Sequence, residues 1–269
     1  MGTSPETCSR TCYDQIADIY DDDMGRNMRF ADVSYYVERA LENRGRILEL
    51  GCGTGRVTLP LLRAGLTVTA VDISGRMLSA LQENCKRTCT RSEQSRLQIA
   101  QMDVRQGGLR GKFSTILLPY SFFTYFVEPS EQRGLLSYIH RQICRDGHCV
   151  IDAFIPNPTI RYGEPIWDYT RSIADGRILQ RWKMLERGLD PAVNLIRRHY
   201  RLLDRSFKIL RTMSTVERIR CSTPKQMMTL LEENGYELLT IDWNYGSSAG
   251  SSDAQFATYR CRPLSPAAP

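Results

Sequence analysis

The sequence predicts an α/β fold: a parallel β-sheet covered by helices, with an antiparallel β-meander inserted late in the chain. Three observations support it. Strand-like and helix-like segments alternate from residue 46 to about residue 156, which is the pattern of parallel sheets. A glycine-rich turn at 51–55 follows the first strand-like segment. After Pro158, apolar and polar residues alternate in three runs, which is typical of an antiparallel sheet with one solvated face.

Composition restricts the class of protein. Of the 269 residues, 42% are hydrophobic and 25% charged, as in globular proteins, and this length suits one large domain or one domain with an appendage. No run of about 18 apolar residues occurs and "MGTSPETCSRTC" has no secretory pattern, so we expect a cytoplasmic protein with no membrane contact. The nine cysteines lack the spacing of most zinc sites, so we expect reduced thiols and no metal.

The net charge of +6 would suit an acidic partner such as nucleic acid. The basic residues, however, form no block of like charges. A solvated basic surface is the favoured interpretation, a nucleic-acid partner is unlikely, and a monomer or homodimer is expected.

The amino-terminal half has clear element boundaries. Residues 13–44 are predicted to be helical with an interruption at Gly25, and a strand follows at 46–50. A helix after Gly55 ends at Gly65. The strand 67–73 precedes a helix that Ser74 should cap.

The remaining elements follow from the same signals. Strands are predicted at 96–104, at 113–123 with an end marked by Pro119, and at 148–156. A helix between them should start at a Ser130 cap and stop at Gly147. The meander runs are 177–185, 193–203 and 207–219, and a helix at 223–235 and strands at 236–245 and 256–264 complete the chain.

The turn after the first strand separates two classes of cofactor. Its motif, E-x-G-x-G-x-G, consists of Glu49, Gly51, Gly53 and Gly55. A dinucleotide fingerprint, G-x-G-x-x-G, would need glycine at Arg56 or Thr58. A pyrophosphate also avoids a nearby acid, whereas Glu49 suits the cationic amino-acid tail of S-adenosylmethionine. The motif therefore favours S-adenosylmethionine over a dinucleotide.

Two further acids follow successive strands. Asp72 ends the second strand, where a carboxylate can accept both ribose hydroxyls of either cofactor. Asp103, in "QMDV", closes the third strand, where it can accept the exocyclic amine of adenine. Three acids at three successive strand ends form a stronger signal than any one of them.

The segments "LELGCGTG", "AVDIS" followed by "ML", and "MDV" resemble a class I S-adenosylmethionine-dependent methyltransferase over most of residues 13–158. The meander is similar to the lid or dimer strands inserted in the small-molecule branch of this superfamily. The resemblance implies a Rossmann-like seven-stranded sheet and a division of the chain into four parts. These are an N-terminal helical lid (1–44), the cofactor-binding core (45–158), the meander as lid or dimer strands (159–222), and a C-terminal helix with the last two strands (223–264).

The resemblance also implies roles for residues. The three glycines of the turn border the methionine part, and Ile73, Met77 and Val104 enclose the adenine. Tyr20 covers the sulfonium and Arg29 pairs with the cofactor carboxylate. The cofactor-binding residues expected are Tyr20, Arg29, Glu49, Gly51, Cys52, Gly53, Gly55, Asp72, Ile73, Met77, Met102, Asp103, Val104 and Leu118.

The acceptor pocket should lie where the fourth and fifth strands end. Methyltransferases of DNA bases or protein amides have (N/D)-P-P-Y there, whereas this chain has "LPYS", so that substrate class is disfavoured. The aromatic run "YSFFTYF" instead favours a flat, aromatic or heteroaromatic acceptor. The acceptor-binding residues expected are Tyr13, Tyr120, Ser121, Phe122, Phe123, Tyr162, Trp167 and Trp182.

Methyl transfer from an activated sulfonium needs alignment and exclusion of water more than it needs a metal. The candidate catalytic residues are Tyr120, Tyr20 and His199. The expected activity is methyl transfer to nitrogen or oxygen of a small specialised metabolite. The alternatives are an RNA or protein methyltransferase, suggested by the basic charge, and a non-catalytic S-adenosylmethionine-binding subunit; a dehydrogenase is disfavoured by the broken fingerprint.

Overall fold

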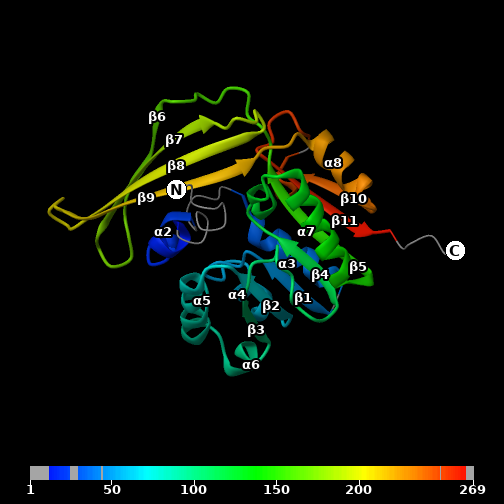
Figure 1. Cartoon of the computed structure of the whole chain (residues 1–269). Helices are drawn as coiled ribbons and strands as arrows, with labels where there is room; N and C mark the ends of the chain where they lie inside the picture. Colours follow the sequence, from blue (N-terminus) through cyan, green and yellow to red (C-terminus); the bar gives the residue numbers. More distant parts are fainter. Residues whose placement is uncertain (1–11, 25–29, 44, 249, 265–269) are drawn as a thin grey trace.

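The computed structural model describes residues 12–24, 30–43, 45–248 and 250–264. A seven-stranded sheet flanked by helices forms the core, and a separate four-stranded sheet lies beside it (Figure 1). Within these ranges, no helix has the length and apolar character needed to cross a membrane.

The core sheet has the strand order β10-β11-β5-β4-β1-β2-β3. Its strands are β1 (Arg46–Leu50), β2 (Thr67–Asp72), β3 (Leu97–Gln101), β4 (Phe113–Leu118), β5 (Ile143–Phe154), β10 (Tyr236–Trp243) and β11 (Phe256–Pro263). Strands β1 to β5 pair in parallel, but β11 is antiparallel to both of its neighbours. The sheet is therefore mixed rather than wholly parallel, because the connection from β10 to β11 is too short for a crossover helix.

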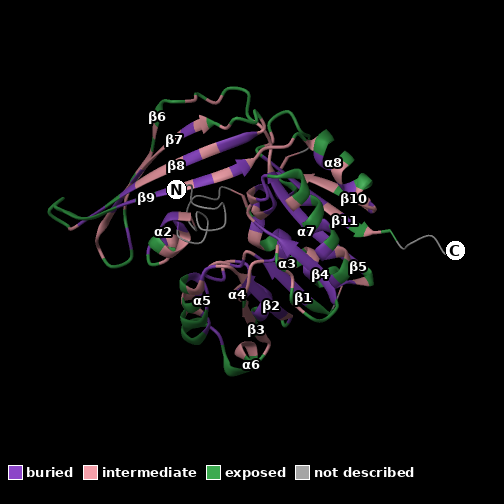
Figure 2. Cartoon of the chain, in the orientation of Figure 1, coloured by how far each residue is buried: buried purple, intermediate pink, exposed green. Residues whose placement is uncertain are grey.

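Helices cover both faces of this sheet. They are α3 (Asp32–Glu42), α4 (Thr58–Arg63), α5 (Gly75–Thr88), α6 (Arg91–Gln94), α7 (Pro129–Gln142) and α8 (Pro224–Glu233), with short 3₁₀ turns η2 (Phe122–Tyr125) and η3 (Asn244–Gly246). Leu48 and Leu50 of β1 face the core cluster under α7 and α8, whereas Ile47 faces the cluster under α3, α4 and α5. The central strands β1 and β4 are therefore buried on both sides (Figure 2).

Two helix boundaries test the capping predictions. Ser74 caps α5 as predicted, because its hydroxyl accepts the Met77 backbone N–H at 3.1 Å. The predicted start and stop of the next long helix were wrong. That helix, α7, begins at Pro129, with the Glu131 carboxylate accepting the Glu128 N–H, and it ends at Gln142 because the following residues already pair with β4.

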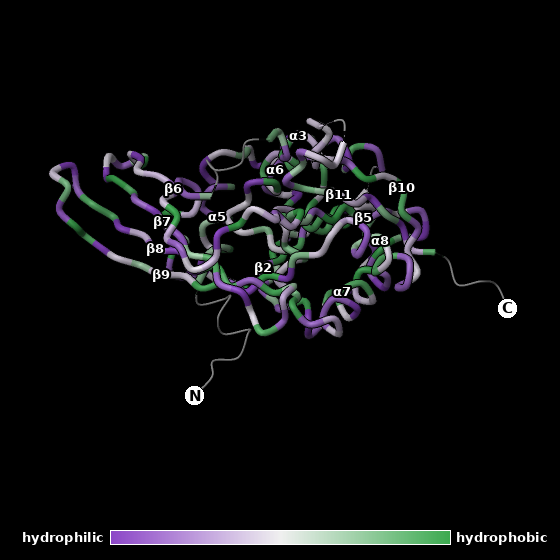
Figure 3. The backbone as a smooth tube through the Cα atoms, turned by 90° about the horizontal axis from the view of Figure 1, so that it is seen from above, coloured by the Kyte–Doolittle hydropathy of each residue, from purple (hydrophilic) through white to green (hydrophobic). Residues whose placement is uncertain are grey.

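The second sheet is antiparallel with the order β6-β7-β8-β9. Its strands are β6 (Pro165–Ser172), β7 (Ile178–Arg187), β8 (Val193–Leu203) and β9 (Ile209–Arg220). They extend to one side of the core (Figure 3). The sequence predicted β7, β8 and β9 but not β6, because a proline at its start and a bulge between Trp167 and Tyr169 interrupt the alternation.

Residues 12–24 form a segment that lies between this sheet and the core (Figure 1). It is helical at 12–16, turns at 17–19 and continues as α2 (Tyr20–Asp23), so the predicted continuous helix is broken. The turn allows both Ile16 and Ile19 to pack in one cluster with Tyr200 and Leu202 of the sheet. We call this side of the four-stranded sheet its inner face.

Glu49 does not reach the cavity that the glycine turn borders. Side-chain alternation along β1 places it on the α4 side, where it is buried and accepts the Thr58 hydroxyl at 2.5 Å. The prediction that Glu49 faces a bound amino-acid tail therefore lacks geometric support. Burial raises the pKa of Glu49 to about 8, opposed by the Thr58 hydrogen bond and by Arg56.

This raised pKa predicts a pH-dependent stability. The folded state holds the Glu49 proton more tightly than the unfolded chain, so stability falls as pH rises from about 4.5 to about 8. We expect the stability of Glu49→Gln to fall by roughly 3–5 kcal/mol less than that of the unsubstituted protein over this pH range. Urea denaturation of both proteins at a series of pH values measures it, and parallel pH profiles would contradict the prediction.

Candidate active site

A cavity of about 110 Å³ lies at the carboxyl ends of β1, β2, β3 and β4. We call it the cofactor cavity. It is beside the reversal of strand order between β1 and β4, where open α/β sheets bind ligands. Its lining residues are Tyr13, Tyr20, Gly51, Gly53, Val71, Asp72, Ile73, Met77, Met102, Asp103, Val104, Arg105, Pro119, Tyr120, Phe122, Tyr125 and Phe126.

The glycine turn shapes one wall of the cofactor cavity. Gly51 has φ +72°, and a β-carbon on it would collide with the Phe122 ring. Gly53 has φ +54°, and a β-carbon on it would lie 3.8 Å from the Tyr20 ring. Both positions therefore need glycine for backbone conformation, and at Gly53 the missing side chain also leaves a shallow cradle between the turn and the tyrosine.

Asp72 joins two loops at the edge of this cradle. One carboxylate oxygen accepts the Gly53 N–H and the other accepts the Ser74 N–H, both at 2.9 Å. Burial raises the pKa of Asp72, and these backbone hydrogen bonds oppose the shift. Each oxygen retains a further lone pair, so the same carboxylate can accept ligand hydroxyls.

The next part of the cavity suits a flat apolar ring. Ile73, Met77, Met102 and Val104 line this part of the cavity, and the role expected for Ile73, Met77 and Val104 in enclosing adenine stays a prediction. Asp103 lies at the far end and forms an ion pair with Arg105 at 3.3 Å. One ligand with hydroxyls near one acid and an amine near the other would match this order of groups.

Three tyrosines close the cavity from the lid side. The Tyr13 and Tyr20 rings meet edge to face at 6.0 Å, and the Tyr13 and Tyr125 hydroxyls are hydrogen-bonded at 2.6 Å. Burial raises the pKa of each of the three. They are therefore neutral phenols at physiological pH, suited to enclosing a cation and not to removing a proton.

Tyr120 is held in the cavity wall by a left-handed turn after β4. Tyr120 and Ser121 have φ values of +55° and +57°. Asp152, fully buried at the end of β5, accepts both backbone N–H groups, that of Tyr120 at 3.0 Å. It also accepts the Tyr36 hydroxyl at 2.5 Å and the Tyr245 hydroxyl, so four donors surround this carboxylate.

Several predicted residues lie in the walls behind the cavity. Leu118 and Phe123 belong to the core cluster, and Ser121 is fully buried beneath the turn. Cys52 and Gly55 support the glycine turn but are not among the lining residues. Arg29 lies outside the described residues.

The structure does not bring His199, Trp167 and Trp182 to the cofactor cavity. The two tryptophan rings stack at 5.9 Å, and the His199 ring stacks on Trp182 at 5.4 Å. They form a row across the outer face of the four-stranded sheet, opposite the inner face that carries Tyr200. The roles predicted for them in catalysis and acceptor binding lose their geometric basis. Tyr162 lines a second, separate cavity.

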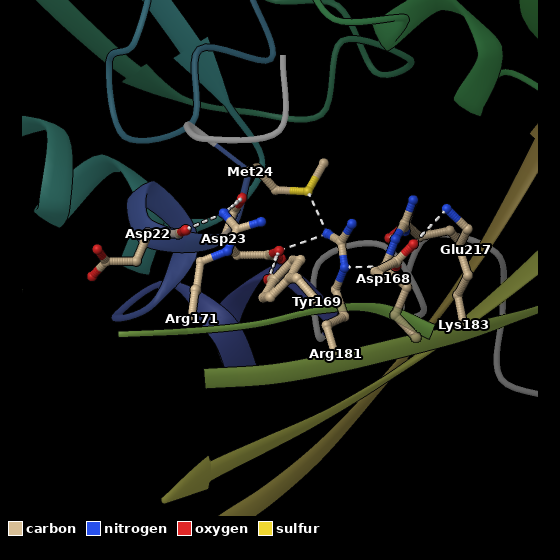
Figure 4. Close-up of polar contacts among 10 residues, drawn as sticks. Asp22, Asp23, Met24, Asp168, Tyr169, Arg171, Arg181, Lys183 and Glu217 are labelled. Atoms are coloured by element: carbon tan, nitrogen blue, oxygen red, sulfur yellow. Dashed lines mark hydrogen bonds and ion pairs between the residues drawn. The ribbon is translucent and has the colours of Figure 1, made fainter. Parts of the chain in front are cut away.

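A buried polar network ties α2 to the inner face of the sheet (Figure 4). Asp23, at the end of α2, forms an ion pair with Arg181 at 2.6 Å and accepts the Tyr169 hydroxyl. Asp168 bridges Arg181 and Lys183. The network fixes α2, and hence Tyr20, relative to the second sheet.

Two charged groups at the site had no signal in the sequence. Arg56 follows the glycine turn, pairs with Asp32 at 2.6 Å and lies over the Tyr120 ring at 5.3 Å. Arg105 lies over the Phe126 ring at 4.8 Å while pairing with Asp103. Both depend on contacts between distant segments, which local spacing does not reveal.

The groups lining the cavity fit S-adenosylmethionine. Acids lie near the expected ribose and adenine amine, an apolar slot separates them, and the Gly53 cradle faces neutral aromatic rings. Fold and cavity together resemble those of the class I S-adenosylmethionine-dependent methyltransferases. Residues 47–147 match the family model for a methyltransferase domain.

Three similar proteins illustrate the relationship. The Bacillus subtilis protein YqeM, named as a methyltransferase without a substrate, is 25% identical over 172 residues, covering 64% of this chain and 66% of its own. An S-adenosylmethionine-dependent methyltransferase of Clostridium acetobutylicum superposes with a TM-score of 0.77 at 16% identity, over 94% of this chain and 100% of that one. The sugar N-methyltransferase KedS8 of a Streptoalloteichus species gives 0.67 at 18% identity, over 90% and 91%.

The match spans only part of the curated relatives. It covers 66% of YqeM and 47% of a Geobacillus relative that is 28% identical. The two structural neighbours are less than 25% identical and establish the fold. Among the described residues, no group of three or more His, Cys, Asp or Glu side chains is placed to hold a metal.

The donors around Asp152 predict that Asp152→Asn lowers the stability of the protein, although the side chain keeps its size and shape. Asp152→Asn replaces an acceptor with an N–H among four donors, so we expect a loss of about 2–3 kcal/mol. Chemical denaturation measures it. Asp242→Asn is the matched control, because its carboxylate is less buried and accepts two side-chain hydroxyls, that of Tyr35 at 2.7 Å and that of Thr240 at 3.4 Å. Equal losses in the two variants would contradict the proposed role of Asp152 in holding the turn.

The lid network predicts an effect on cofactor affinity. Asp23→Asn leaves Arg181 less well compensated and loosens α2, which carries Tyr20. We expect adenosylhomocysteine to bind about tenfold more weakly by calorimetric titration, or ~1.4 kcal/mol. Asp18→Asn is the control, because Asp18 and Arg211 are paired but about half exposed. Unchanged affinity in Asp23→Asn would show that the network does not position the lid.

Proposed function

We propose that this chain transfers the methyl group of S-adenosylmethionine to a nitrogen atom of a small-molecule acceptor. The observation that carries the proposal is the cofactor cavity, in which acids and an apolar slot lead to a cradle enclosed by neutral tyrosines. The bound donor supplies a sulfonium methyl group that is already activated for displacement. The chain itself contributes alignment, exclusion of water and aromatic faces around the cation.

Nitrogen is favoured over oxygen by the groups that line the cavity. The described lining residues include no His, Lys or Glu, and its acids are engaged with backbone N–H groups or with Arg105. Burial also raises the pKa of Tyr20 and Tyr120. An alcohol would need a base at this point, whereas an amine can lose its proton before it enters.

The sequence predicted an aromatic or heteroaromatic acceptor from the run after β4. Tyr120, Phe122, Tyr125 and Phe126 line the cofactor cavity, so they are available to the donor as well. We therefore propose a small molecule that bears an amine, with no requirement for an aromatic ring. The sugar N-methyltransferase KedS8, which shares the fold, supports an acceptor of this size. Monomer or homodimer stays a prediction that gel filtration tests.

The test uses donor labelled in the methyl group. Protein and donor are incubated with separate small-molecule, RNA and protein fractions of cell extract, and the labelled product is identified by mass. We expect label in the small-molecule fraction and on nitrogen. Asp72→Ala should abolish labelling and weaken adenosylhomocysteine binding by about 100-fold, since Asp72 is proposed to hold the ribose.

Gln101→Ala is the matched control for Asp72→Ala. Gln101 of β3 lies opposite Asp72 of β2 in the strand register but does not line the cavity. Label confined to RNA or to protein would overturn the small-molecule proposal. Cofactor binding with no transfer to any fraction would favour a non-catalytic subunit.

A further inference from the structure

A second cavity of about 550 Å³ lies between the two sheets. Its walls are the segment 154–158 after β5, the inner faces of β7, β8 and β9, and the loop 251–255. The volume falls within the roughly 300–1,000 Å³ typical of sites for small ligands. Both structural units contribute to it.

The sheet wall of this cavity combines apolar and cationic side chains. Leu185, Ile196 and Ile219 supply apolar surface, and Lys183 and Arg198 are the charged groups on this wall. Arg198 is nearly buried and forms an ion pair with Glu217, yet its Nε atom has no hydrogen-bond partner in the described part of the chain. A buried donor without a partner is costly, so it marks a place where a ligand acceptor would be stabilised.

The opposite side carries little compensating charge. Asp253 is the acidic residue among those lining the cavity, and it is exposed in the 251–255 loop. The carboxylates that pair with Lys183 and Arg198, namely those of Asp168 and Glu217, do not line the cavity. The surface presented to a ligand by the sheet is therefore positive.

A hydrogen-bonded chain connects this wall to the cofactor cavity. Glu217, paired with Arg198 through one oxygen, accepts the Tyr125 hydroxyl through the other at 2.9 Å. Tyr125 in turn contacts Tyr13, and both line the cofactor cavity. Burial raises the pKa of Tyr120, and among the nearby charges Arg198 opposes this shift most strongly. The side chains of Arg198, Glu217 and Tyr125 therefore link the walls of the two cavities.

We propose that the 550 Å³ cavity is the acceptor site, and that it takes an amine-bearing molecule with an anionic group held by Lys183 and Arg198. The proposal rests on the proposed function, because it places the acceptor of that reaction. The cationic wall binds the anionic group by charge-assisted hydrogen bonds. The apolar side chains hold the remainder of the molecule, and the amine is directed past Tyr125 and Glu217 toward the donor methyl group, because transfer requires the nitrogen to contact that methyl group.

Cys221 provides a reporter inside this cavity. Its thiol lines the cavity and is half-buried, and burial raises its pKa. The probes are the anionic 2-sulfonatoethyl and the cationic 2-(trimethylammonium)ethyl methanethiosulfonates. In each reaction the Cys221 thiolate attacks the sulfenyl sulfur, a mixed disulfide forms and methanesulfinate leaves. Rates are measured at mildly alkaline pH by peptide mass mapping and divided by the rates with 2-mercaptoethanol.

We expect the anionic probe to be favoured by at least about threefold after this normalisation. Lys183→Gln should reduce the preference. Arg197→Gln should not, because Arg197 is the neighbour of Arg198 on β8 and pairs with Glu186 on the outer face. Equal normalised rates, or a preference that survives Lys183→Gln, would overturn the anionic assignment. A Cys221 that reacts only after unfolding would overturn the cavity as a binding site.

The link to catalysis is tested on the same modified protein. Modification of Cys221 should leave adenosylhomocysteine binding unchanged and reduce methyl transfer to the labelled fraction at least about tenfold, with Cys221→Ser unaffected by the reagent. Full transfer by the modified protein would show that the acceptor binds elsewhere. Absence of transfer by the unmodified protein would defeat the proposed function, while the probe rates would still decide the charge preference.

Discussion

One carboxylate, that of Asp72, holds together the two loops on which the cofactor cavity depends. Parallel strands bring their carboxyl ends to one edge, but they leave the loops beyond them free to diverge. Asp72 accepts one N–H from the glycine turn after β1 and one from the start of α5. The apolar slot of Ile73 and Met77 and the cradle at Gly53 therefore keep a fixed spacing before any ligand binds. Such preorganisation reduces the entropy lost on binding.

The second sheet is attached to the core through charge as well as through apolar contact. Ile16 and Ile19 give the lid a hydrophobic contact with the sheet, but such contacts permit sliding. The buried pair of Asp23 and Arg181 specifies one position, because each charge is costly without the other. Since Tyr20 precedes Asp23 in the same short helix, a contact far from the donor site determines where the aromatic cover lies.

Part of the lining of the cofactor cavity could be predicted from the sequence, because those residues directly follow the strands that position them. Asp72 and Asp103 follow strands directly, and the parallel arrangement then brings them to one edge whatever the rest of the chain does. The sequence of the meander gave less information about the site. Alternation along β7 and β8 shows that two faces exist, but nothing local decides which face is inner. His199 and Trp182 therefore became expected site residues, whereas their neighbours Arg198 and Arg181 face the core. The partners of Asp152 come from three distant segments, so its role required the three-dimensional fold.

Burial determines what chemistry the tyrosines can perform. It raises the pKa of Tyr13, Tyr20 and Tyr125, so each keeps its proton at neutral pH. A neutral phenol is a weak base, but its ring face stabilises a cation, and the sulfonium charge disperses as the methyl group moves. The enclosure therefore supports displacement without supplying proton transfer, and the nucleophile must arrive with a free lone pair. An amine that has lost its proton before binding is nucleophilic enough to react, whereas an alcohol needs a base to remove its proton, so the surroundings of the donor favour an amine acceptor.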